Sequence, residues 1–170
     1  MRAFAPHCKT TSGVRLVSPA AIDPRTIGAY RETEYRVFEE PPFSLHVDRF
    51  SAPLRRAQHR RNVGCSAFVT AWNPFSRILD PAANAARQRR LAEELGRARL
   101  AFVPGIGLHP TEPWPGEESF LVYGLDLDTA RAMGSRLEQN AILWSGDDAI
   151  PRLILCGSAR PDDGSRVSGK

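Results

Sequence analysis

Side chains that form strong hydrogen bonds while carrying little charge stand in four separate stretches of this sequence, near residues 70–76, 84–88, 109–119 and 138–140. Buried without partners, such groups cost about 1–3 kcal/mol each, so a cluster of them must bind one another, water or a ligand. If the fold brings them together, they predict a pocket for a polar or anionic small molecule. The candidate ligand-binding residues are Trp72, Asn73, Ser76, Asn84, Gln88, His109, Glu118, Gln139 and Asn140.

An ordinary structural interpretation of the same residues stays open. Asn73 before Pro74, and the run at 138–140, are typical of turns and caps, where such side chains pair with neighbouring backbone groups. A ligand is favoured by the positive end of the helix dipole expected from residue 80 onward, with Arg77 before it and Arg87 within it. That charge would suit an anionic or strongly polar ligand.

The distribution of charge suggests a second class of function. The 170 residues contain 23 Lys and Arg against 19 Asp and Glu, but residues 49–99 alone hold eleven basic and three acidic residues. We therefore keep nucleic-acid or ribosome-associated binding through segment 49–99 as an alternative, against a merely solvated helix face. A protein-interaction or regulatory module that pairs through a sheet edge is a further alternative. The candidate anion or nucleic-acid contacts are Arg55, Arg56, Arg60, Arg61 and Arg87.

Motifs for catalysis are missing from the sequence. It has no Walker A segment and no Gly-x-Ser-x-Gly elbow, and Gly105-Ile106-Gly107 lacks the third glycine of a dinucleotide fingerprint. His109, Glu112, Glu117 and Glu118 could in principle form a metal site or an acid/base pair, but no further well-spaced ligands accompany them. We predict no metal or cofactor, assign no catalytic residue, and leave open whether the protein is an enzyme.

Local patterns predict the elements that must position the candidate site. Asp23-Pro24 and Asp80-Pro81 each have the form of a helix N-cap followed by an N1 proline, which predicts helices running to about residues 39 and 99. Residues 104–117 are rich in Pro and Gly and predict a long loop. Two shorter helices are expected at 53–62 and from 126 or 128 to 137. Strands are expected at 43–47, 66–73, 100–103, 119–125, 141–144 and 153–155.

The order from residue 66 to 144 is β-α-β-β-α-β, which predicts an α+β fold with a ferredoxin-like split core, an extra N-terminal helix and flanking strands. A doubly wound sheet is disfavoured because the connection from 103 to 119 holds no predicted helix. In a split core, the four polar stretches meet at one sheet edge. We expect a flexible lead-in at 1–21, a single domain at 22–156 and a flexible tail at 157–170.

Three cysteines, Cys8, Cys65 and Cys156, form neither a Cys-x-x-Cys pair nor a metal-ligand spacing, which favours a reducing cytoplasm. No apolar run approaches the ~20 residues needed to cross a bilayer, so no membrane partner is expected. The oligomeric state is left open.

Segments TAWNPFS (70–76), EESFLVYG (117–124) and EQNAILW (138–144), with IDPRTIGAYRETEYRV (22–37) upstream, resemble a family of small bacterial proteins described only as a domain of unknown function. The resemblance covers roughly residues 22–156. It implies a bacterial, cytosolic protein, and it adds no activity, substrate or catalytic residue.

Overall fold

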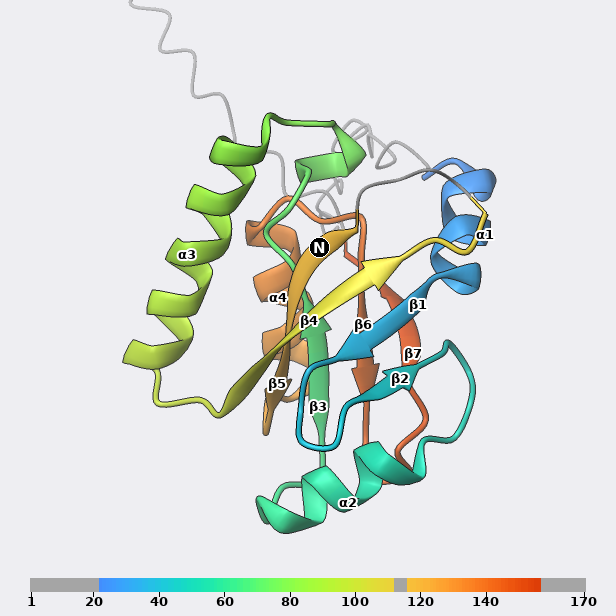
Figure 1. Cartoon of the computed structure of the whole chain (residues 1–170), viewed down its shortest axis with the longest axis vertical. Helices are drawn as coiled ribbons and strands as arrows, with labels where there is room; N and C mark the ends of the chain where they lie inside the picture. Colours follow the sequence, from blue (N-terminus) through green and yellow to red (C-terminus); the bar gives the residue numbers. More distant parts are fainter. Residues whose placement is uncertain (1–21, 112–115, 157–170) are drawn as a thin grey trace, which may run out of the picture.

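The computed structural model describes residues 22–111 and 116–156, and the lead-in and tail expected from the sequence lie outside them. One sheet of seven strands has the order β2-β1-β4-β5-β3-β6-β7, and each neighbouring pair is antiparallel (Figure 1). The strands are β1 (Glu34–Val37), β2 (Phe43–Leu45), β3 (Ser66–Val69), β4 (Phe102–Leu108), β5 (Glu117–Tyr123), β6 (Ala141–Ser145) and β7 (Arg152–Leu155). The helices are α1 (Pro24–Glu32), α2 (Ala52–Arg60), α3 (Pro81–Arg97) and α4 (Leu127–Arg136), with a short 3-10 turn η1 (Pro74–Ser76).

Aspartate caps start three of these helices. Asp23 accepts a hydrogen bond from the Arg25 backbone N–H at 2.8 Å, and Asp80 accepts from two N–H groups of the first turn of α3 at 2.9 and 3.2 Å. Asp126 caps α4 in the same way. Each side chain satisfies N–H groups that have no partner within their own helix. The helix starts expected from the Asp-Pro pairs are thus confirmed.

The first helix is shorter than the sequence suggested. It was expected to reach residue 39, but it ends at Glu32, and β1 begins two residues later. Alternation explains the change, because Tyr35 and Val37 are buried while Arg36 between them is exposed, a period that only a strand provides.

The expected loop at 104–117 is also wrong in its first half, since β4 continues through Pro104 to Leu108. Gly105 pairs with Ser119 inside the sheet, and the Phe68 ring of β3 lies across it. A Cβ at residue 105 would lie 2.6 Å from both that ring and the Arg36 carbonyl oxygen. The glycine therefore marks a close approach within a strand and does not mark a turn.

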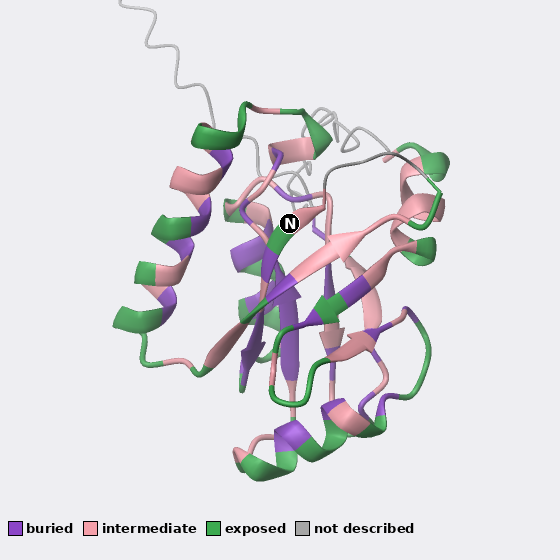
Figure 2. Cartoon of the chain, in the orientation of Figure 1, coloured by how far each residue is buried: buried purple, intermediate pink, exposed green. Residues whose placement is uncertain are grey.

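Different elements pack on the two faces of the sheet. Helices α3 and α4 cover one face, where Leu91 of α3 and Met133 of α4 pack in one core with Val69 of β3. Figure 2 shows α3 buried along its sheet side and exposed outside. The sheet curls, so that β1 and β2 pack with α2 against the other face, in a core that joins Val37 and Leu54. We call this second face the concave face.

These elements confirm the α+β class. The stretch from β3 to β6 runs β3-α3-β4-β5-α4-β6, but the sheet has three more strands and curls, so the ferredoxin-like assignment stays a prediction. Among the helices of the described residues, none combines the length and the apolar character needed to span a membrane.

Candidate functional site

A cavity of about 360 Å³ lies between α1 and the concave face of the sheet. Four of the nine ligand-binding residues expected from the sequence line it, namely Asn73, Ser76, His109 and Gln139. The other five do not line it, namely Trp72, Asn84, Gln88, Glu118 and Asn140. The volume falls at the lower end of the range for small-molecule sites, about 300–1,000 Å³.

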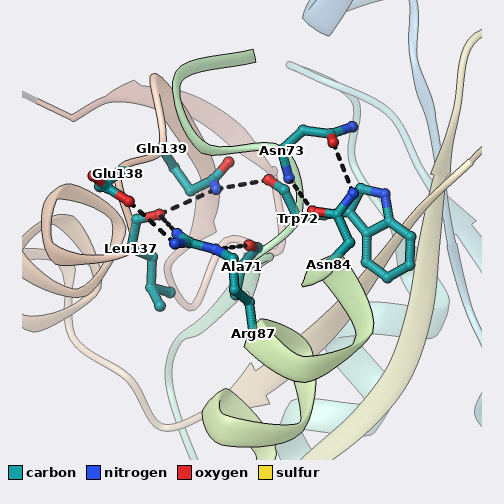
Figure 3. Close-up of polar contacts among 8 residues, drawn as sticks. All are labelled: Ala71, Trp72, Asn73, Asn84, Arg87, Leu137, Glu138 and Gln139. Carbon is teal, nitrogen blue, oxygen red and sulfur yellow. Dashed lines mark hydrogen bonds and ion pairs between the residues drawn. The ribbon is translucent and has the colours of Figure 1, made fainter. Parts of the chain in front are cut away.

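The chain segment 70–76 forms one rim of this cavity through Thr70, Asn73 and Ser76. Side chains hold the backbone of its residues 71–73 (Figure 3). From α3, Asn84 accepts from the Asn73 N–H at 2.9 Å and Gln88 accepts from the Ala71 N–H at 3.0 Å. Both amides are almost fully buried, at 2% and 4% exposed. Their contacts satisfy backbone groups of the protein itself, so they position the rim without facing the cavity.

Arg87 and Gln139 hold the carbonyl groups of the same segment. Arg87 donates to the Ala71 oxygen at 2.8 Å, to the Leu137 oxygen at 2.8 Å and to the Glu138 carboxylate at 3.1 Å (Figure 3). Gln139 donates from Nε2 to the Trp72 oxygen at 2.9 Å. Trp72 therefore contributes its backbone here, and its side chain is not among the cavity-lining groups. The guanidinium of Arg87 joins α3, the segment after β3 and the turn before β6.

The rim carries an unusual backbone. Asn73, Phe75 and Ser76 all have positive φ, of 44°, 49° and 57°, although none is glycine. Each such residue costs of order 1 kcal/mol and persists only where surrounding contacts impose it. Here the imposed conformation turns the Asn73 side chain, so that Oδ1 accepts from the Leu79 N–H at 3.1 Å while Nδ2 donates to Glu117 at 2.8 Å.

A three-residue hydrogen-bond cluster connects this rim to α1. The hydroxyl groups of Tyr30 and Ser76 lie 2.9 Å apart, and Asn140 Nδ2 donates to both, at 3.2 and 3.0 Å. Asn140 was expected to line the pocket, but its amide secures the helix that covers it. Helix α1 itself has no buried residue, so these polar contacts matter to its position (Figure 2).

Strand alternation separates the two glutamates at the start of β5. Glu117 and Ser119 line the cavity, while Glu118 between them is exposed and points to the other face of the sheet. Burial raises the pKa of the Glu117 carboxyl, and the hydrogen bond from Asn73 lowers it by less. The sequence reasoning chose Glu118; the period-2 pattern toward buried Leu121 could have identified Glu117 instead.

The cavity floor consists of residues that the sequence reasoning did not select. The rings of Tyr35 and Phe68 line it and meet edge to face, with centroids 5.4 Å apart and planes at 75°. Their positions depend on β1 crossing the concave face, which no local pattern reveals. The floor is therefore apolar and aromatic beneath a polar rim.

His109 lies at the cavity edge, where its Nε2 is 3.6 Å from the Glu32 carboxylate of α1. Within residues 22–111 and 116–156, no group of three or more His, Cys, Asp and Glu side chains is arranged to hold a metal ion.

The arginines of the expected nucleic-acid surface have different environments. Arg60 and Arg61 contact Glu39 at 2.8 and 2.7 Å, and Arg61 also stacks 4.1 Å from the Tyr123 ring centroid. Arg55 and Arg56 are exposed on α2. Of the five arginines, Arg60, Arg61 and Arg87 thus form hydrogen bonds to protein groups, and Arg55 lies over the Phe50 ring at 6.0 Å.

A family described as "Protein of unknown function (DUF3293)" matches residues 69–142. The match covers less than half of the chain, from the end of β3 through α3, β4, β5 and α4 into β6. It contains the rim residues Asn73, Arg87 and Gln139 together with Glu117. No curated protein and no solved structure matches the chain. Over these residues the chain is therefore similar to a family of uncharacterised proteins, in agreement with the resemblance noted in the sequence; a bacterial origin stays a prediction.

Proposed function

We propose that this protein binds a polar small molecule in the cavity between α1 and the concave face of the sheet. The observation that carries the proposal is the convergence of Asn73 and Ser76, from the turn after β3, with Gln139, from the turn before β6, on one cavity of about 360 Å³. Pockets that combine an apolar floor with a few fixed polar groups are the usual form of small-molecule sites. The backbone of residues 71–73 is fixed by side-chain hydrogen bonds. This supports the proposal, because a preorganised rim lowers the entropy lost on binding.

A cavity-filling variant tests this proposal without removing any rim hydrogen bond. Ala29 lines the cavity from α1, so Ala29→Leu places a larger side chain inside it. Ala132→Leu makes the same change at an exposed position of α4 and serves as the control. Native mass spectrometry of protein purified without added ligand should show a bound small molecule in the wild type and the control, and its loss in Ala29→Leu. Wild-type protein that carries no ligand, and that no member of a metabolite library stabilises against heat, would contradict the proposal.

We also propose that the fold contains a ferredoxin-like core. The neighbouring strands β4-β5-β3-β6 have the order of a ferredoxin-like core, and both crossover helices, α3 and α4, pack on the same face. In that view, β1, β2, β7 and α1 are additions that build the cavity around residues 66–145. A cytoplasmic location and a single domain over residues 22–156 belong to the same proposal.

Nucleic-acid binding is the second candidate, and the exposed Arg55 and Arg56 favour it. Because Arg60 and Arg61 contact Glu39, the informative variant is Arg55→Gln with Arg56→Gln. Under this alternative, the affinity for a labelled oligonucleotide falls steeply with salt and falls further in the double variant. A flat salt response would exclude it.

A further inference from the structure

Among the described residues that line the cavity, Glu117 is the one with a carboxylate. The titratable residues that line the cavity are Arg25 and Tyr30 on α1, Tyr35 on β1, His109 after β4, and Glu117 on β5. Arg25 is exposed in the first turn of α1, and His109 lies against Glu32. The Tyr35 hydroxyl donates to the Tyr30 carbonyl oxygen at 2.8 Å, and burial raises its pKa. Glu117 thus supplies the negative charge inside.

Glu117 has no cationic partner among the residues that the structure describes. Its recorded hydrogen bond comes from Asn73 Nδ2, at 2.8 Å to Oε1. A carboxylate has two oxygens with room for about four hydrogen bonds, and a half-buried one that lacks a counter-ion is costly to keep charged. A ligand that brings a positive charge and N–H donors would remove that cost. An anionic ligand would increase it.

The floor next to Glu117 defines the rest of the ligand. Tyr35 and Phe68 present an edge-to-face aromatic pair to the cavity, a surface that suits a planar or otherwise apolar body. Gly107 also lines the cavity and lies beside the Tyr35 ring.

We infer that the cavity takes an amine: a small molecule whose protonated amino group bonds Glu117 and whose apolar or aromatic body lies on Tyr35 and Phe68. This inference rests on the proposed function, because it names the chemical class of the ligand for the same cavity. The sequence predicted a polar or anionic ligand. At this wall of the cavity the inference replaces the anionic ligand with a cationic one.

Three probes of matched size separate charge from shape: 2-phenylethylamine, phenylacetate and 2-phenylethanol. Each is titrated into the full chain at neutral pH by calorimetry. We expect the amine to bind at least about tenfold more tightly than the other two, a difference of about 1.4 kcal/mol. A carboxylate or alcohol that binds as tightly as the amine, or an amine that does not bind, overturns the inference.

Two isosteric variants locate the effect. Glu117→Gln keeps an oxygen that can accept from Asn73 but removes the charge, whereas Glu118→Gln removes the same charge on the other face of the sheet. We expect the amine affinity to fall at least about tenfold in Glu117→Gln and to stay unchanged in Glu118→Gln, while 2-phenylethanol binds all three proteins alike. Equal losses in both variants overturn the inference. The proposed function is contradicted by a different result, namely the absence of any copurified or library ligand. If a variant does not fold, the comparison of the three probes on the wild-type protein still tests the inference.

Discussion

Asn73 shows how one side chain can serve both interpretations of the polar residues. Its Oδ1 accepts from the Leu79 N–H and from Asn84 inside the fold, while its Nδ2 reaches Glu117 at the cavity. Turn chemistry and site geometry therefore depend on the same amide. Replacing Asn73 would disturb both, so the partners of Asn73 are better probes of its structural role.

We predict that Asn84→Ala destabilises the protein by about 1–3 kcal/mol. The substitution removes a buried acceptor from the Asn73 N–H and a donor to the Asn73 Oδ1, and it leaves the N–H without a partner. Urea unfolding measures the change, with Arg89→Ala, exposed on the same helix, as the control. A variant as stable as the control would mean that water replaces the Asn84 contacts.

The pH dependence of stability should report Glu117. Burial raises its folded-state pKa above the ordinary value of 4.5, so the folded protein holds a proton that the unfolded chain releases. This contribution to stability is present at low pH and is lost as pH rises through the folded-state pKa. In Glu117→Gln this loss is absent. We therefore expect the variant to gain stability relative to the wild type as pH rises from about 4 to about 8.

Urea unfolding across this pH range tests the expectation, with exposed Glu118→Gln as the control for a change of net charge. A stability difference between Glu117→Gln and the wild type that stays constant with pH would show that the carboxyl titrates normally.

At the scale of elements, local chemistry predicted where helices start but not where they lie. Asp23 and Asp80 specify the starts of α1 and α3 through contacts within three residues, which a sequence shows directly. The place of α1 over the cavity depends instead on contacts such as Tyr30 with Ser76 and Arg31 with Asp48. These join residues far apart in the chain, and no periodicity reveals them. The cavity was for this reason predicted only along one rim.

The course of β4 gives a prediction at the scale of elements. Gly105→Ala should destabilise the protein by about 1–3 kcal/mol, because the new Cβ meets the Phe68 ring and a backbone oxygen at 2.6 Å. Gly96→Ala is the control, since nothing lies within 4 Å of its Cβ position on α3 and a helical alanine should gain up to about 1 kcal/mol. Thermal unfolding of both variants checks the opposite signs. A stable Gly105→Ala would show that both the Phe68 ring and the backbone of β1 at Arg36 can move away from β4.

At the scale of the whole molecule, the two ends of the concave face differ in how their buried carboxylates are paired. The cavity end beneath α1 contains Glu117, whose hydrogen bond comes from the neutral amide of Asn73 and which forms no ion pair with the described residues. At the α2 end, Glu39 is surrounded by Arg60, Arg61 and the Tyr123 hydroxyl, which donates to its carboxylate. Burial raises the pKa of Glu39, but these three hydrogen bonds together outweigh burial and lower it. The amino-acid composition shows an excess of basic residues, but only the fold shows which arginines form ion pairs within the protein.

This contrast separates structural from free arginines. Arg61→Gln should cost roughly 1–3 kcal/mol, because the Glu39 side chain is only 9% exposed and would lose a charged partner, and because Tyr123 would lose the guanidinium stacked on its ring. Arg56→Gln, exposed on α2 one turn before Arg61, should stay within about 0.5 kcal/mol of the wild type. The loss in Arg61→Gln should shrink at low pH, since Glu39 with its lowered pKa stabilises the fold only while ionised. Urea unfolding at neutral and acidic pH measures both, and equal stabilities of the two variants would mean that Arg60 and Tyr123 alone satisfy Glu39.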